Sequence, residues 1–177
     1  MITHAISQAA RFLGYEIRAQ RCDTKLTGPR RSSSGIIGLY VPRDVIRQHR
    51  APYMSGGNPA SRGVLLHDSD FSIVATYQGE YRGLVQYYLL AQDVSSRFSH
   101  LRWVMETSML KTLANKHRST VTRMARKYRT FVKTEAGPLR CFEVTVERDG
   151  GRKPLVARFG AFRSDTSAKL SWRTTSR

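Results

Sequence analysis

Between residues 71 and 89, apolar and aromatic side chains recur at spacings of three and four, which is the repeat of one face of an α-helix. The residues in this pattern are Phe71, Val74, Tyr77, Tyr81, Leu84, Val85, Tyr88 and Leu89. Asp68, Ser69 and Asp70 precede them, and short polar side chains of this kind cap helix N-termini. The pattern predicts an amphipathic helix whose apolar face must pack against other elements. We therefore interpret most of its aromatic residues as core.

Two further helices are predicted downstream, and they can cover that face. The longer runs from about Phe98 to Lys116, and its inward residues would be Leu101, Val104, Met105, Met109 and Leu113. The shorter follows Ser119 or Thr120, either of which can cap it, and would bury Val121, Met124, Ala125 and Tyr128. Pro42 can open another short helix with Val45 and Ile46 inward, because the first turn does not need the N–H that proline lacks.

Strand patterns flank the predicted helices on both sides. Residues 13–19 alternate between apolar and polar, residues 36–41 are mostly apolar, and the basic stretch between them would form a loop. Residues 142–146 alternate again, a turn follows at 149–151, and residues 155–159 are predicted as the return strand. We predict an α+β fold with an N-terminal β-hairpin, a helical bundle and a small C-terminal β-meander. The predicted divisions are 1–42, 43–134, a β-hairpin at 135–160 and a disordered tail at 161–177.

Charge restricts the class of partner. The chain carries 30 Lys and Arg against 13 Asp and Glu, a formal net charge of +17 in 177 residues. Such an excess favours nucleic acid or an anionic membrane surface, and argues against an enzyme for small neutral substrates. Cys22 and Cys141 form no CxxC pair, which argues against a disulfide framework or a cysteine zinc site and favours a reducing compartment. No stretch approaches 18 apolar residues and no secretory signal is visible, so we expect a cytoplasmic protein without a membrane partner.

The strongest functional signal is a run without acidic residues between Glu106 and Glu135. Like charges at helical spacing repel each other, and a polyphosphate backbone offsets this repulsion while counterions are released. We predict nucleic-acid binding here, with a solvated helix face or an anionic membrane as alternatives. A membrane-surface helix would need its apolar side open to lipid, whereas the predicted core needs that side. The candidate residues are Lys111, Lys116, His117, Arg118, Arg123, Arg126, Lys127, Arg129 and Lys133, with Arg30 and Arg31 as a second, smaller site.

Two separated basic sites suit a large folded RNA that is recognised by shape and backbone. The sequence has no zinc-finger ligand set, no basic region followed by a heptad zipper and no aromatic RNP signature. It also has no Walker A loop, G-x-G-x-x-G, G-x-S-x-G or H-E-x-x-H. Ser108 and Lys111 match S-x-x-K, which is common by chance, and Asp68 and Asp70 suit a helix cap better than a metal site. We expect no catalytic residue, metal, cofactor or small-molecule substrate.

Short strings in a fixed order carry a family resemblance. They are Phe12-Leu13-Gly14-Tyr15, Val41-Pro42, Glu80-Tyr81-Arg82-Gly83-Leu84, Tyr87-Tyr88, Leu101-Arg102-Trp103, Lys111-Thr112-Leu113-Ala114 with Lys116 and His117, Glu143-Val144 and Val156-Ala157-Arg158-Phe159-Gly160. The first resembles the F-L-G-Y strand near the end of a reverse-transcriptase palm. The others resemble domain X, the maturase domain of group II intron-encoded proteins, in its bacterial branch. The resemblance covers about Phe12 to Gly160.

The resemblance implies the thumb of a reverse transcriptase, a mostly helical bundle that grips intron RNA and stabilises its active form. The full family proteins also carry a Tyr-x-Asp-Asp palm motif, and many carry an HNH endonuclease with Cys and His ligands; this sequence matches neither. Residues 161–177 also depart from the family pattern. We therefore expect a truncated or split fragment, made of a last palm strand and domain X, without the polymerase active site.

The leading hypothesis is a bacterial maturase that binds structured group II intron RNA and assists splicing, while the ribozyme performs the chemistry. One alternative is the non-catalytic thumb of an RNA-directed DNA polymerase whose palm is a separate chain. The other is a general basic nucleic-acid-binding module.

Overall fold

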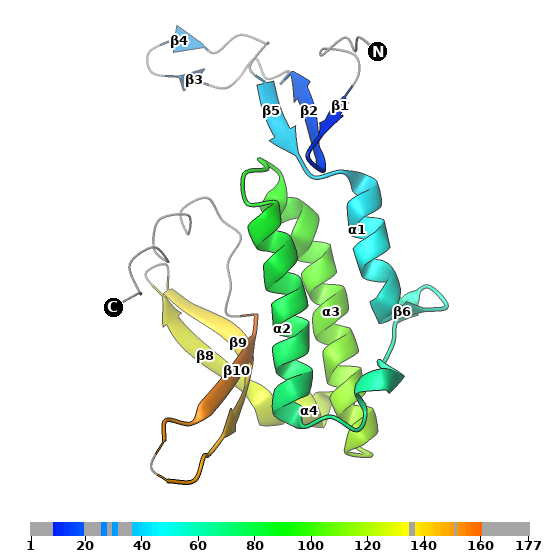
Figure 1. Ribbon diagram of the computed structural model, residues 1–177, viewed down its shortest axis with the longest axis vertical. Helices are drawn as coiled ribbons and strands as arrows, with labels where there is room; N and C mark the ends of the chain where they lie inside the picture. The colour runs from blue at the N-terminus through cyan, green and yellow to red at the C-terminus, as the bar shows by residue number, and fades with distance from the viewer. Residues whose placement is uncertain are drawn as a thin grey trace.

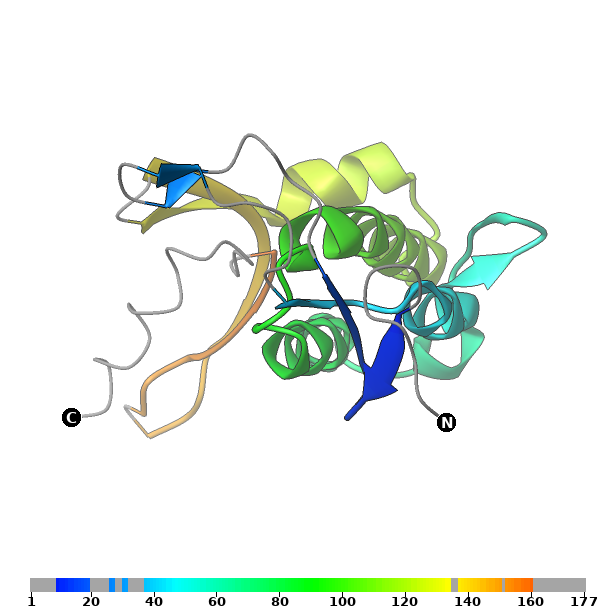
Figure 2. The ribbon, with the colours of Figure 1, turned by 90° about the horizontal axis from the view of Figure 1, so that it is seen from above.

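The computed structural model describes residues 9–19, 26–27, 30–31, 37–134, 137–150 and 152–160. Two long helices, α2 (Asp70–Tyr87) and α3 (Val94–Lys116), lie side by side at its centre and are joined by a short turn (Figure 1). A shorter helix, α4 (Val121–Tyr128), lies across the lower end of α3. The C-terminal sheet curves along one side of the helix pair, and α1 (Arg43–Arg50) lies on the other (Figure 2). The predicted α+β layout is confirmed.

The helices begin at the polar residues that the sequence offers as caps. The Ser69 Oγ accepts a hydrogen bond from the Ser72 N–H at 3.0 Å, and the Thr120 Oγ1 accepts one from the Arg123 N–H at 3.2 Å. Pro42 directly precedes α1. α3 starts earlier than predicted, at Val94, because this residue is buried and continues the apolar face of the helix.

The core lies where α2 packs on α3 and on the C-terminal sheet. The fully buried side chains of α3 include Phe98, Leu101, Val104, Met105, Met109 and Leu113, in agreement with the predicted period. On α2 the buried residues are Ile73, Val74, Tyr77, Tyr81 and Val85. Leu84, which we expected to face inward, lies at the edge of this stripe and is only partly buried. Val45 and Ile46 of α1 also pack against the core as partly buried residues.

The C-terminal sheet has three antiparallel strands in the order β10-β9-β8. They are β8 (Arg129–Thr134), β9 (Gly137–Val146) and β10 (Leu155–Phe159), and Phe142 pairs with both Arg129 and Phe159. The predicted return strand is confirmed. However, the sheet begins at Arg129, before the hairpin predicted at 135–160, because α4 passes directly into β8. We did not predict β8, since the apolar side chains Phe131 and Val132 lie on opposite faces and break the alternation.

The N-terminal sheet has the order β1-β2-β5. Its strands are β1 (Ala10–Phe12), β2 (Tyr15–Ala19) and β5 (Ile37–Tyr40), and Ile17 pairs with Leu39 as the predicted hairpin requires. β1 was not predicted, and Leu13 does not belong to a strand. Leu13 and Gly14 have φ of 46° and 75°, which is the geometry of a two-residue hairpin turn between β1 and β2.

This sheet contacts the helix pair through tyrosines. The Tyr87 hydroxyl donates to the Leu13 carbonyl at 2.8 Å, and the Tyr15 hydroxyl donates to the Tyr87 carbonyl. In the connection between β2 and β5, β3 (Leu26–Thr27) pairs with β4 (Arg30–Arg31). The predicted tail at 161–177 lies outside the described residues.

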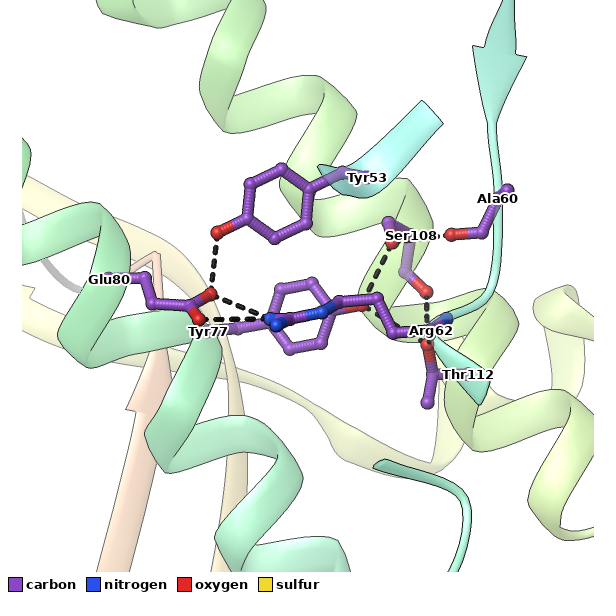
Figure 3. A network of polar contacts seen from close by, with 7 residues as sticks. All are labelled: Tyr53, Ala60, Arg62, Tyr77, Glu80, Ser108 and Thr112. Carbon is purple, nitrogen blue, oxygen red and sulfur yellow. Dashed lines mark hydrogen bonds and ion pairs between the residues drawn. The ribbon is translucent and has the colours of Figure 1, made fainter. Parts of the chain in front are cut away.

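Polar contacts fix residues 53–63 across α2 and α3 (Figure 3). This segment contains the short strands β6 (Met54–Ser55) and β7 (Asn58–Pro59). The Arg62 guanidinium and the Tyr53 hydroxyl both bind the Glu80 carboxylate, at 2.8 and 2.5 Å. The Tyr77 hydroxyl lies 2.8 Å from Ser108 Oγ, which donates to the Ala60 carbonyl. Ser108 therefore joins this segment to α2 and α3.

Candidate nucleic-acid interface

The run without acidic residues occupies the last turns of α3, all of α4 and β8. The structure divides its cations into two groups. Three of them, Lys111, Lys116 and His117, contact other parts of the protein. The others are exposed, and they are Arg118, Arg123, Arg126, Lys127, Arg129 and Lys133. We call these six residues the α4–β8 surface.

Lys111, Lys116 and His117 hold elements of the protein together. Lys111 Nζ donates to the Pro59 carbonyl at 2.7 Å, which anchors the segment that carries β7. Lys116 Nζ donates to the Asp68 carbonyl at 2.6 Å and to Asp70 Oδ1 at 2.7 Å. His117 Nε2 lies 2.8 Å from Asp70 Oδ2. We predicted all three as RNA ligands. These contacts engage them within the protein, and our proposal below rests on the six residues of the α4–β8 surface.

Asp70 joins three helices. It is the first residue of α2, and it accepts hydrogen bonds from Lys116 at the end of α3 and from the Tyr128 hydroxyl at the end of α4. Burial would raise the pKa of Asp70, but the hydrogen bonds from Lys116, Tyr128 and His117 outweigh it and lower the pKa to about 2. Burial and the bond to Asp70 raise the pKa of Tyr128. Asp70 thus acts as a charged tie between helices, whereas the cap that we considered for it is supplied by Ser69.

The six exposed cations form no ion pair with another described residue. On α4, Met124 and Tyr128 face the core while Arg123, Arg126 and Lys127 face outward. Arg129 and Lys133 lie on one face of β8, since alternate residues of a strand share a face. Lys127 Nζ lies 4.7 Å from the centre of the Tyr128 ring, a cation–π contact. The surface therefore carries positive charge that the described part of the protein leaves unpaired.

Arg118 has an unusual backbone conformation. Its φ is 45°, in the left-handed region that glycine normally occupies after a helix. The Arg118 N–H donates to the Asn115 carbonyl and the Ser119 N–H donates to the Ala114 carbonyl, which is the hydrogen-bond pattern of a Schellman motif. An arginine at this position costs backbone energy that a glycine would not. Strain of this kind is found most often at functional positions.

Sequence reasoning missed three exposed residues on α3, β8 and β9 as candidates for binding: Trp103, Phe131 and Arg140. Phe131 and Arg140 are paired across β8 and β9, and this could not be seen because β8 was not predicted. Trp103 offered a signal, because it falls out of phase with the buried residues Leu101 and Val104.

For the second predicted basic site, the structure describes the backbone but not the side chains. Arg30 and Arg31 form β4, near the end of the molecule opposite α4 (Figure 1). Their side chains lie outside the described residues, so their role stays a prediction. Within the described residues, no group of His, Cys, Asp and Glu side chains is arranged to hold a metal ion, and no helix is long and apolar enough to cross a bilayer.

Comparison with known proteins decides the family. Residues 37–161 match the family described as type II intron maturase. The chain belongs to this family. The match runs from β5 to the end of the C-terminal sheet and includes the whole α4–β8 surface, so the family suggested by the sequence strings is confirmed.

Two curated relatives agree with this membership. Both are named group II intron-encoded protein LtrA, one from Lactococcus lactis subsp. cremoris and one from its strain MG1363. Each is 37% identical over 134 residues, which is 70% of this chain. The chain spans about a fifth of the length of these relatives, 22%. It is thus similar to one part of a larger intron-encoded protein.

The strained position of Arg118 leads to a test that separates binding from stability. In Arg118→Gly, we expect stability to rise by up to about 1 kcal/mol, because glycine adopts positive φ without a steric cost. RNA affinity should fall, with a salt dependence shallower by about one phosphate contact. Urea unfolding and RNA titration measure the two effects. Arg118→Lys is the matched control, because it keeps both the charge and the strain. If the glycine variant loses stability, Arg118 is not strained in the folded protein. If it binds RNA as tightly as the unmutated chain, Arg118 does not contact RNA.

Proposed function

We propose that this chain is the RNA-binding part of a group II intron maturase. It binds the folded intron RNA in the bacterial cytoplasm and helps the RNA reach its splicing-active form, while the RNA performs the chemistry. The observation that carries this proposal is the α4–β8 surface. It is exposed, of a single charge sign, unpaired within the described chain, and located inside the segment that matches the maturase family.

Electrostatics explains why RNA is the partner that suits this surface. Arg123 is spaced three and four residues from Arg126 and Lys127, so these cations are neighbours on α4 and repel one another. Phosphate groups remove this repulsion, and each neutralised phosphate releases counterions and adds affinity. This part of the binding is independent of sequence, so it positions the protein without selecting one intron.

Selection of a folded RNA requires cations at fixed separations. α4 is held by the buried side chains of Met124 and Tyr128, and the Tyr128 hydroxyl is bonded to Asp70 on α2. β8 continues from α4 and is paired along its length with β9. The cations of the α4–β8 surface are thus mounted on packed elements, which is what recognition by RNA shape needs.

The salt dependence of binding tests the surface directly. We expect the double variant Arg126→Ala/Lys127→Ala to flatten the slope of log K against log salt by about 1 to 2, because each phosphate contact contributes about 0.7 to 0.9. The probe is a labelled transcript of the L. lactis intron that encodes LtrA. The matched control is Arg152→Ala/Lys153→Ala, which removes the same charge from exposed residues in the β9–β10 connection. Equal slopes for both double variants would remove α4 from the interface.

A second function, the thumb of a polymerase with a separate palm chain, is favoured by one observation. Phe12 and Leu13, in the string that resembles a palm strand, are 63% and 70% exposed. Tyr87, which bonds to the Leu13 carbonyl, is 56% exposed beside them. Exposed apolar side chains that lie together suit a protein interface. We infer that a palm could dock on this end of the N-terminal sheet.

Primer extension on an RNA template tests this second function. The chain alone should give no cDNA, because polymerase chemistry needs carboxylates that hold two metal ions about 4 Å apart, which we assign to the palm. Mixing the chain with LtrA shortened to lack the matched region should restore synthesis, and Phe12→Ser/Leu13→Ser should abolish the restoration. No cDNA from the mixture would reject the palm partner. cDNA from the chain alone would show that polymerase activity resides in this chain.

A further inference from the structure

Trp103 lies on the outer face of α3 with 53% of its surface exposed. Its neighbours Leu101, Val104 and Met105 are fully buried, so the helix core does not need this ring. A large exposed aromatic side chain in a strongly charged protein is a candidate contact for a partner.

The Trp103 ring is held in a defined position. The His100 ring is stacked beside it, with ring centres 5.6 Å apart and planes inclined by 30°. His100 Nε2 in turn lies 3.3 Å from Arg50 Nη1 on α1. A flat ring that is supported on one side by a histidine and remains more than half exposed resembles the platforms on which proteins stack nucleobases.

A second exposed aromatic residue, Phe131, is linked to the Trp103 region of α3 through one side-chain contact. Phe131 on β8 is 64% exposed, and it is paired with Arg140 on β9. Arg140 Nη2 donates to Glu106 Oε1 at 2.9 Å, and Glu106 follows Trp103 by one turn of α3. The contact between Arg140 and Glu106 therefore connects the two aromatic positions. Arg129 and Lys133 lie on either side of Phe131 on the same face of β8.

We propose that Trp103 and Phe131 stack unpaired nucleobases of the RNA whose backbone binds the α4–β8 surface. This inference rests on the proposed function and adds the class of RNA segment that is bound. Cations alternating with exposed aromatic rings are the composition of single-strand RNA sites, in which the cations take the phosphates and the rings take the bases. In a duplex the base faces are stacked on each other, so duplex RNA cannot use the rings. The charge of the surroundings favours RNA over a protein partner at these positions.

Fluorescence of Trp103 provides the test. The chain has two tryptophans, Trp103 and Trp172, so Trp172→Phe makes Trp103 the single reporter. We titrate this variant with a 12-nucleotide single-stranded RNA and with a 12-base-pair RNA duplex. Stacking predicts strong quenching by the single strand and little by the duplex. Trp103→Ala should weaken single-strand binding by about tenfold, leave duplex binding within twofold and leave the salt slope unchanged. Trp103→Phe should restore part of the lost affinity, because it keeps a ring.

The control is Arg126→Ala/Lys127→Ala in the Trp172→Phe background. It should weaken both RNAs and flatten the salt slope, while the quenching at saturation stays the same. Several results would overturn the proposal: no quenching, equal losses for both RNAs in Trp103→Ala, or no loss at all. If binding is unchanged and the unmutated chain self-associates while Trp103→Ala does not, the ring covers a protein interface instead.

The same experiments separate the stacking proposal from the proposed function. Quenching without any preference for intron RNA would support stacking and reject the maturase function. A preference for intron RNA without quenching would support the maturase function and reject stacking on Trp103.

Discussion

The position of the basic surface depends on the carboxylate of Asp70. It accepts hydrogen bonds from the last residues of α3 and from Tyr128 at the end of α4, while it begins α2 itself. These bonds hold its pKa at about 2, so the group is charged at any pH near neutrality. Because β8 continues directly from α4, the same tie that orients the helix also orients the strand. Loss of this tie would leave the cations present but no longer fixed in relation to one another.

Several of the described acidic residues form ion pairs within the fold. Three pairs join different elements: Glu80 with Arg62, Glu106 with Arg140, and Glu143 with Arg158. The fourth pair, Asp93 with Arg97, lies at the start of α3. None of these carboxylates forms an ion pair with a cation of α4 or β8. In a chain with a net charge of +17, the six exposed cations of the α4–β8 surface thus have no carboxylate partner among the described residues. We regard this distribution, rather than the total charge, as the feature that suits a folded RNA.

The sequence predicted the helices well because their apolar residues repeat with a clear period and short polar residues precede them. It placed Leu101, Met105 and Met109 in the core correctly. It missed β8, whose apolar residues do not alternate, and the turn at Leu13, whose positive φ is unusual for leucine. For the surface, the sequence supplied the charges but could not separate Lys111, Lys116 and His117, which have partners within the protein, from the cations of the α4–β8 surface. Their partners lie about fifty residues away along the chain, so only the packed structure brings them together.

The central claim is that this chain recognises the shape of a group II intron and not merely its charge. The direct measurement is a pair of titrations at one salt concentration, with the folded L. lactis intron transcript and with a length-matched transcript of scrambled sequence. We expect the intron to bind at least about tenfold more tightly, a difference of about 1.4 kcal/mol. Equal affinities would contradict the maturase account and would assign the α4–β8 surface to a general basic nucleic-acid-binding module.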